Sequence, residues 1–236
     1  MSKNNYFYLS LGHRCYTAIY LIERGLRTVA YPFDHIISKF DGIIDCFEND
    51  FENFFPKEIK VTEYPTPSGG KGKFYASKNF HVNHHDLSDP TVINKFKERI
   101  QRLDNKLKEC ENNNVKTVFM RTVLCHTDYL KADRFINAIK NKYPRLEFKI
   151  IFINDVKAQE RKIFKVNNQV MFAHSSSNPN QGPRNKNVID FTESNDIFDP
   201  EVWNSLPQLP KRINTGNDEF KAKVSFSRLN PFDPNN

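Results

Sequence analysis

Short apolar runs alternate with amphipathic segments along most of this chain, and that alternation limits the folds it can adopt. Residues 115–120 form one apolar run, residues 129–143 repeat apolar side chains with a helical spacing, and residues 148–153 form a second apolar run. Apolar runs of this length without polar alternation are typical of strands buried on both faces. The pattern predicts an α/β fold in which a mainly parallel sheet is flanked by helices.

The start of the chain follows the same pattern. Residues 7–11 are an apolar strand, and a helix is expected from Cys15 to Arg24, with Gly25 in the left-handed conformation that ends it. Asp34 precedes a second helical repeat that is rich in Phe and extends to Phe54. We therefore expect Asp34 to be the N-cap of that helix.

The apolar period changes from helical to two between residues 57 and 88. Short strands are expected at 61–64, 74–77 and 80–84, which indicates an inserted β-hairpin region. The Gly-Gly-Lys-Gly sequence at 69–72 is not expected to bind phosphate, because no apolar strand enters it and no helix leaves it.

Further elements follow the insertion. Asp89 and Pro90 are suited to begin a long helix, a short basic helix is expected at 157–165, and strands are expected at 170–173 and 188–191. We expect residues 1–206 to form one domain that contains the hairpin insertion. The remainder, 207–236, has few apolar residues in register, which predicts a tail that wraps the surface or is partly disordered.

Charge and cysteine content limit the partners and the compartment. The 236 residues include 35 Lys and Arg against 28 Asp and Glu, and ten of those cations lie between Lys131 and Lys165. A run of this kind is explained by helix faces that are exposed to solvent. Nucleic acid is not an expected partner, because the run lacks the interleaved aromatic residues on which bases stack. Four cysteines without a C-x-x-C pair or a secretion signal indicate a reducing cytoplasm, which for a viral protein is the host's. No apolar run reaches the roughly 18 residues of a membrane helix.

Cys15 is the first candidate for chemistry. It lies where a strand ends and a helix begins, so unpaired backbone N–H groups favour its thiolate, and His13 and Arg14 add to that effect if their side chains turn inward. The alternative is a packing role, because one helical face is shared by Cys15, Ala18, Ile19 and Ile22.

A second set of candidates follows from the predicted sheet. In an open parallel sheet, ligands bind beyond the carboxyl ends of the strands. The residues that follow or end the predicted strands are Gly12, His13, Arg14, Arg121, Asn154, Asp155 and His174. Guanidinium, imidazole and carboxylate groups at one edge are suited to an anionic or phosphate-bearing ligand, although strand ends of any α/β domain carry polar residues.

Three histidines lie close together in the run Phe80 to Asp86. His84 shares a strand face with Phe80 and Val82, whereas His81 and His85 share the other face. A zinc site is not expected, because His81 and His85 are roughly 13 Å apart on an extended strand and only Cys125-His126 offers further ligands. One of these histidines can instead serve as the base for a thiol, oriented by Asp86 or Asp155. No cofactor is expected.

The opening of the chain resembles a known family. The run Ser10 to Cys15, then Gly25-Leu26-Arg27, then Pro32-Phe33-Asp34-His35 is similar to the S-L-G-x-x-C, G-L-R and F-D-W motifs of a domain family of unknown function described as papain-like cysteine peptidases. The likeness extends over roughly residues 6 to 160, and His35 stands where the family usually has Trp.

This resemblance implies a cysteine hydrolase. Cys15 would be the nucleophile and His84 or His85 the base, with His85 preferred because His84 shares the apolar face of its strand. The resemblance also implies a papain-like α+β fold, in which the cysteine helix packs on an antiparallel sheet that carries the histidine. The alternation of strands and helices disagrees, and we expect the α/β architecture.

Three functions stay open from the sequence. The first is a cysteine-dependent peptidase or acyl transferase acting on a peptide or protein, with an oxyanion held by backbone N–H groups near Gly12 and Cys15. The second is a transferase or binding domain for a nucleotide or sugar phosphate, which uses Arg14, Arg121, Asp155 and His174, with Asp34 also a candidate ligand-binding residue. The third is a non-catalytic effector that binds a partner through its Phe-rich helix and basic surface.

Overall fold

A computed structural model describes residues 6–13, 15–55, 60–65, 70–82, 85–123, 126–154, 163–174 and 186–209. Its strands are β1 (Tyr6–Ser10), β2 (Ile37–Ser38), β3 (Lys60–Pro65), β4 (Lys71–Ala76), β5 (Phe80–Val82), β6 (Lys116–Val123), β7 (Phe148–Asn154), β8 (Ile163–Lys165) and β9 (Val170–His174). Its helices are α1 (Tyr16–Glu23), α2 (Phe40–Glu48), α3 (Pro90–Asn112), the 3₁₀ helix η1 (His126–Lys131), α4 (Ala132–Lys142), α5 (Lys186–Ser194) and α6 (Pro200–Ser205).

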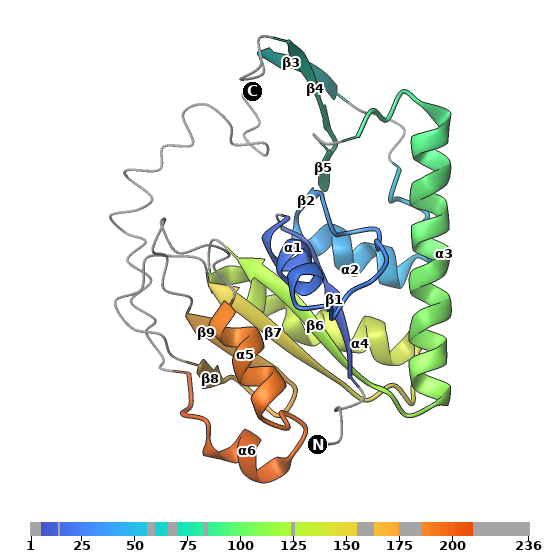
Figure 1. The fold of residues 1–236 in the computed structure, drawn as a ribbon. Coiled ribbons are helices and arrows are strands. Elements are labelled where there is room, and N and C mark those ends of the chain that lie inside the picture. The colour runs from blue at the N-terminus through green and yellow to red at the C-terminus, as the bar shows by residue number, and fades with distance from the viewer. Residues whose placement is uncertain are drawn as a thin grey trace.

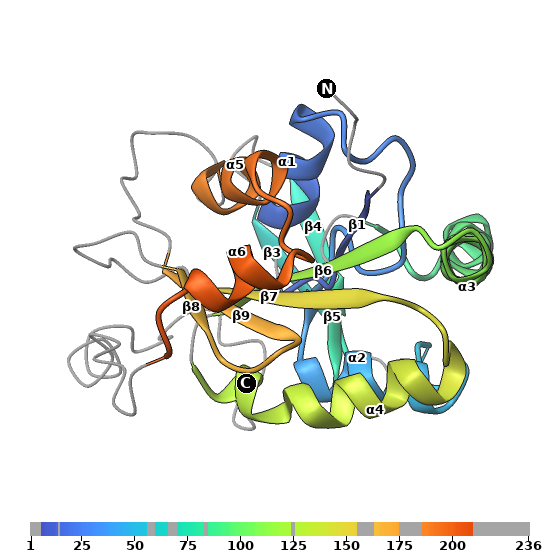
Figure 2. The ribbon, with the colours of Figure 1, turned by 90° about the horizontal axis from the view of Figure 1, so that it is seen from below.

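The main sheet has five strands in the order β1-β6-β7-β9-β8. The pairs β1–β6, β6–β7 and β7–β9 are parallel, and only β8 runs antiparallel to its neighbour β9. In Figure 2, α1 and α5 lie on one face of this sheet and α2 and α4 on the other. The protein therefore has the α/β architecture that the alternation of apolar runs predicts.

Alternate residues of each strand face the two sides of the sheet. Phe119, Ile150 and Phe172 pack into a core with α2, α3 and α4. Met120 and Ile151 pack into the opposite core with α1 and α5. Both faces of the sheet are thus buried, which is why these strands read as continuous apolar runs.

A second, antiparallel sheet has the order β2-β5-β4-β3. Its long arm is the β3–β4 hairpin, which projects away from the main sheet, and α3 stands beside both sheets (Figure 1). The predicted hairpin insertion is therefore part of a larger unit, because β5 also pairs with the two-residue strand β2, far upstream in the chain.

The long helix α3 begins as predicted. The Asp89 side chain accepts a hydrogen bond from the Thr91 N–H at 2.8 Å, and Pro90 takes the first helical position. Phe96, Leu103 and Cys110 lie on its buried stripe. The Cys110 side chain is 0% exposed, so it packs within the core.

The Phe-rich segment belongs to the core. Phe40, Phe47, Phe51 and Phe54 are buried in the larger core cluster, which also contains side chains of β6, α3 and α4. The ring of Phe47 lies 5.5 Å from that of Phe135 on α4. These rings are therefore covered by the protein itself and do not form a docking face for a partner.

Three local predictions are wrong. Residues 188–191 lie in helix α5 and not in a strand, because a window of four residues is too short to separate the two periods. Ile163–Lys165 is strand β8 and not the end of a basic helix, since it pairs with β9. The helix predicted from Asp34 begins at Phe40, with Lys39 as its N-cap.

The beginning of the predicted tail is attached to the sheet. The Lys165 N–H donates to the carbonyl of Pro207 at 2.8 Å, and the Leu209 N–H donates to the Lys165 carbonyl at 2.9 Å. Residues 210–236 of the tail, like 155–162 of the predicted basic helix, lie outside the described residues.

Candidate active site

The parallel strands bring their carboxyl ends to one edge of the main sheet. Ser10 pairs with Met120 on β6, while Val123, Asn154 and His174 are register partners at the ends of β6, β7 and β9. The loop that carries Cys15 leaves β1 at this same edge. The side chains of Asn154 and His174, and all of Arg14 and Asp155, lie outside the part of the chain that is described.

A tight turn joins β1 to the cysteine. The Leu11 N–H still donates to the Met120 carbonyl at 2.7 Å, and then Gly12 and His13 both take left-handed conformations, with φ of 70° and 72°. A Cβ at Gly12 would lie 2.7 Å from Ser38 Oγ and 2.9 Å from the Phe33 carbonyl oxygen. Only glycine fits this position without moving its neighbours.

Replacing Gly12 by alanine is expected to destabilise the protein more than the same change at Gly25. Gly25 is also left-handed, with φ of 67°, but has no atom within 4 Å of a Cβ. Gly25→Ala should therefore lower the free energy of unfolding only by the cost of a left-handed alanine, about 1–2 kcal/mol. Gly12→Ala adds a clash worth about 1–3 kcal/mol. Urea denaturation of both variants measures the difference, and equal losses would contradict the close approach of Ser38.

Ser38 closes the turn from the other side. Its buried hydroxyl accepts hydrogen bonds from the His13 N–H at 3.0 Å and from Arg121 Nη1 at 3.2 Å, and donates to the Leu11 carbonyl at 3.5 Å. One donor and two acceptors are the full capacity of a hydroxyl group. Sequence reasoning missed Ser38, because a serine within Ile-Ile-Ser-Lys carries no local signal of a contact 25 residues away.

Arg121 lies beneath this turn and not at the end of its strand. β6 continues to Val123, three residues beyond the predicted run 115–120, so Arg121 lies within the strand, and its side chain is 1% exposed. Its guanidinium donates to the Leu11 carbonyl at 2.9 Å, to the Ser38 carbonyl at 2.9 Å and to Asp128 at 2.7 Å. These contacts make Arg121 a clamp on the cysteine loop, and its binding of a ligand stays a prediction.

Cys15 stands immediately before α1. It is partly exposed, takes the N-cap position and makes no side-chain cap bond. The buried side of α1 is formed by Thr17, Ala18, Tyr20 and Leu21, and Thr17 shares a hydrogen bond of 2.7 Å with Thr122 of β6. Ile22, which was expected to share the packing face of Cys15, is 48% exposed.

The other described cysteines have a different environment. Cys46 is 1% exposed and Cys110 is 0% exposed, and burial raises the pKa of both thiols. A buried thiol with a raised pKa is a poor nucleophile. Cys125 is outside the described residues.

The strand β5 brings the histidine segment to the cysteine loop. Phe80 is the register partner of Ser38, and His81 is the partner of Ile37. His81 is 1% exposed and its ring lies 5.1 Å from that of Phe74. Burial lowers the pKa of His81 to about 4, so its imidazole is neutral at physiological pH.

His85 and Asp86 lie between β5 and α3. The His85 ring meets the Phe96 ring edge-on, with centroids 5.3 Å apart. The Asp86 carboxylate accepts hydrogen bonds from Ser88, Tyr75 and Lys73, which hold the pKa of Asp86 well below its usual range. Asp86 thus stabilises the turn before α3, and an orienting role for it stays a prediction. His84 is outside the described residues.

Asp34 is a core residue. It is 0% exposed, accepts the Tyr31 N–H at 2.5 Å and pairs with Arg27 Nη2 at 2.6 Å. Burial raises the pKa of Asp34 to about 6, against the opposing effect of Arg27. Its predicted N-cap role is wrong because the carboxylate is turned towards these partners. Its ligand-binding role stays a prediction.

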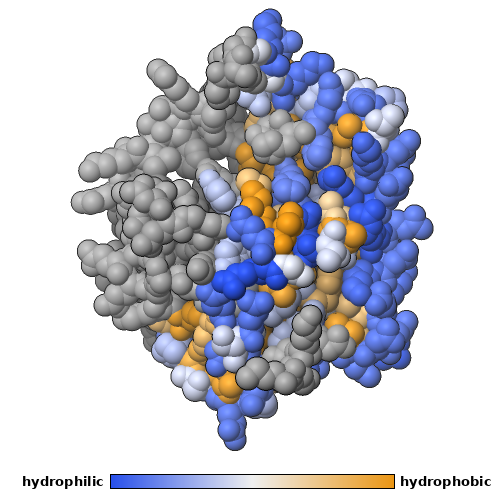
Figure 3. Space-filling view, in the orientation of Figure 1, coloured by the Kyte–Doolittle hydropathy of each residue, from blue (hydrophilic) through white to orange (hydrophobic). Residues whose placement is uncertain are grey.

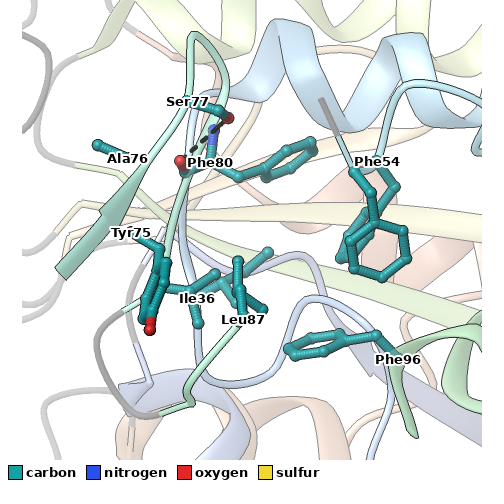
Figure 4. A pocket seen from close by; sticks show the side chains of 10 residues that line it. Ile36, Phe54, Tyr75, Ala76, Ser77, Phe80, Leu87 and Phe96 are labelled. Atoms are coloured by element: carbon teal, nitrogen blue, oxygen red, sulfur yellow. Dashed lines mark hydrogen bonds between the residues drawn. The ribbon is translucent and has the colours of Figure 1, made fainter. Parts of the chain in front are cut away.

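A small apolar cavity lies between the second sheet and α3. Phe54, Phe80, Phe96 and Leu87 line it, and the Ser77 hydroxyl closes the adjoining turn through hydrogen bonds with the Phe80 backbone at 3.1 Å (Figure 4). Its volume of about 20 Å³ corresponds to a single water molecule. It is therefore a packing gap and not a substrate pocket.

The described residues contain neither a group of metal ligands nor a helix that could span a membrane. Within them, no three His, Cys, Asp or Glu side chains are grouped as metal ligands. In the same part of the chain, no helix is long and apolar enough to cross a bilayer. The exposed large hydrophobic residues there are Ile22, Val29, Val61 and Leu130, and in Figure 3 hydrophilic side chains cover the side of the molecule where α3 runs.

A comparison with protein-family models gives a match over most of the chain. The family model described as "Putative papain-like cysteine peptidase (DUF1796)" covers residues 6–158. No curated protein and no solved structure matches the chain. The matched region includes the cysteine turn, Ser38, the histidine segment, Arg121 and the first three strands of the main sheet. The sheet under α1 is parallel, so the papain-like α+β arrangement is not the fold of this chain.

Proposed function

Because the chain belongs to the family described as "Putative papain-like cysteine peptidase (DUF1796)", we propose that it is a cysteine-dependent hydrolase or acyl transferase with Cys15 as its nucleophile. The observation that carries the proposal is the place of Cys15. It is a partly exposed thiol at the start of a helix and at the carboxyl edge of a parallel sheet. Cys46 and Cys110 are enclosed in the core.

In the proposed reaction, the Cys15 thiolate attacks a carbonyl carbon of a peptide or protein while a histidine holds the thiol proton. The histidine then gives that proton to the leaving amine, and water or another acceptor cleaves the thioester. Backbone N–H groups at the start of α1 are suited to hold the oxyanion, because the first turn of a helix has N–H groups without intrahelical partners. The Gly12 N–H is directed to Ser10 Oγ at 3.3 Å, so the oxyanion is assigned to the helix start.

The base is assigned to His84 or His85, with Asp86 or Asp155 as the orienting group. His81 is disfavoured, because a general base works best with a pKa near the working pH and burial lowers that of His81 to about 4. The alternative function, binding of a phosphate-bearing ligand, loses one of its expected donors because Arg121 is directed at the protein backbone and Asp128.

The proposal predicts rapid alkylation of Cys15 in the native protein. At pH 6.5 an ordinary thiol is only about 1% ionised, so an activated cysteine should react with iodoacetamide at least about tenfold faster than a free-cysteine peptide. The rate is measured by peptide mass spectrometry, with Cys46 and Cys110 of the same molecules as internal controls that should react only on unfolding.

The base is identified by the same assay. His84→Ala and His85→Ala are compared with His81→Ala, and one of the first two should remove the rate advantage of Cys15. If Cys15 reacts no faster than the free-cysteine peptide, the nucleophile proposal fails. In that case phosphate-dependent thermal stabilisation would favour the ligand-binding alternative, and its absence the effector alternative.

A further inference from the structure

Ser38 connects the two parts of the proposed site. Its hydroxyl binds the His13 N–H and the Leu11 carbonyl on the cysteine side, at 3.0 Å and 3.5 Å. Its backbone is paired with Phe80, the first residue of the strand that leads to the histidines. One buried residue therefore contacts the cysteine loop and the histidine-bearing sheet together.

The conformation of His13 explains why this contact matters. A residue with a Cβ is disfavoured in the left-handed region, and His13 has φ of 72° only two residues before Cys15. The hydrogen bond from its N–H to Ser38 Oγ offsets that cost. Without the bond, His13 is expected to relax towards negative φ, which would redirect the chain at Cys15.

Arg121 holds Ser38 itself in place. Its Nη2 donates to the Ser38 carbonyl at 2.9 Å, and its Nη1 contacts both the Ser38 hydroxyl and the Leu11 carbonyl. Arg121 of the main sheet therefore holds the Ser38 hydroxyl and carbonyl, and pairing with β5 holds the Ser38 backbone. This rigidity is what a side chain needs if it is to define the position of a reacting group.

We propose that Ser38 is a positioning residue that keeps His13 left-handed and thereby sets the orientation of Cys15 relative to the histidine segment. This inference rests on the proposed role of Cys15 as the nucleophile. Ser38 touches no substrate and is not assigned a catalytic step.

The test compares Ser38→Ala with Ser10→Ala. Both serines are 0% exposed and both hydroxyls accept a backbone N–H of the same turn. The Ser10 bond goes to Gly12, which adopts the left-handed conformation without help. Ser38→Ala should slow Cys15 alkylation at pH 6.5 by about 10-fold to 100-fold and shift its pH-rate profile towards that of a free-cysteine peptide. Ser10→Ala should lower the melting temperature with no such shift.

A double-mutant cycle separates positioning from general destabilisation. Glycine at position 13 needs no partner to stay left-handed, so Ser38→Ala in a His13→Gly background should change the alkylation rate by less than about threefold relative to His13→Gly alone. Both backgrounds are measured well below their melting temperatures. An equal effect of Ser38→Ala in the two backgrounds would overturn the proposal.

The outcomes distinguish the two levels of inference. If wild-type Cys15 is not activated, the nucleophile proposal fails first and the positioning role fails with it. If wild-type Cys15 is activated but Ser38→Ala and Ser10→Ala give the same pH-rate profile, only the positioning role of Ser38 is rejected.

Discussion

Replacing Arg121 by methionine is expected to lower the free energy of unfolding by about 3–5 kcal/mol and to remove the order of the cysteine loop. The guanidinium is 1% exposed, pairs with Asp128 and donates to two backbone carbonyls, those of Leu11 and Ser38. Methionine fills much of the same volume over the Phe40 ring, which lies 5.0 Å from the guanidinium carbon. The decrease in the free energy of unfolding therefore measures mainly the lost hydrogen bonds and ion pair, and only to a small extent the formation of a cavity.

Arg134→Met is the matched control. Arg134 is also an arginine with a carboxylate partner, since its Nε donates to Glu48 at 2.9 Å, but its side chain is 51% exposed. An exposed pair of this kind is worth about 0–1 kcal/mol. Thermal denaturation should show a decrease of roughly 2–4 °C per kcal/mol for a domain of this size. Similar melting temperatures for the two variants would contradict the proposal that the buried contacts of Arg121 stabilise the cysteine loop.

The second large effect is expected at the buried pair of Arg27 and Asp34. Arg27→Met removes the cation that lies 2.6 Å from a carboxylate with 0% exposure. An uncompensated buried charge costs about 3–5 kcal/mol, so the variant should be destabilised by that amount at pH 7.5. The arginine also donates to the Ala18 carbonyl at 3.4 Å, a weak bond that adds little.

The destabilisation caused by Arg27→Met should increase with pH. Burial raises the pKa of Asp34 to about 6, above the value of about 3.9 in an unfolded chain. A raised folded-state pKa adds stability that is fully present below about pH 4 and is lost as the pH rises through about 6. Without Arg27 that pKa rises further, so the variant should lose more stability than the wild type above pH 6.

Urea denaturation at pH 4.5 and pH 7.5 checks this dependence. At the lower pH the Asp34 carboxyl is protonated in the folded state and needs no cation, so Arg27→Met should cost less there. Asp34→Asn serves as the control because it cannot titrate. In an Asp34→Asn background the effect of Arg27→Met should be the same at both pH values, and a persistent difference would assign the pH dependence to another group.

The repeating elements were predictable because their signals are local. The strands β6, β7 and β9, the helix α3 with its Asp89 cap and the left-handed Gly25 all follow from periodicity or from one or two residues. The edge at which Cys15 lies follows from the same elements, since parallel strands joined by helices must place their carboxyl ends together.

Long-range partners carried no such signal. Ser38 lies in a strand of two residues that exists only because β5 pairs with it. Arg121 was predicted to follow its strand because a charged residue interrupts the apolar run, although β6 continues beyond it to Val123. Asp34 has the sequence context of an N-cap, but Arg27 and the Tyr31 N–H bind it in a turn. Periodicity and caps record interactions within a few residues, whereas the partners of a buried polar group depend on which distant segments the packed sheets bring together.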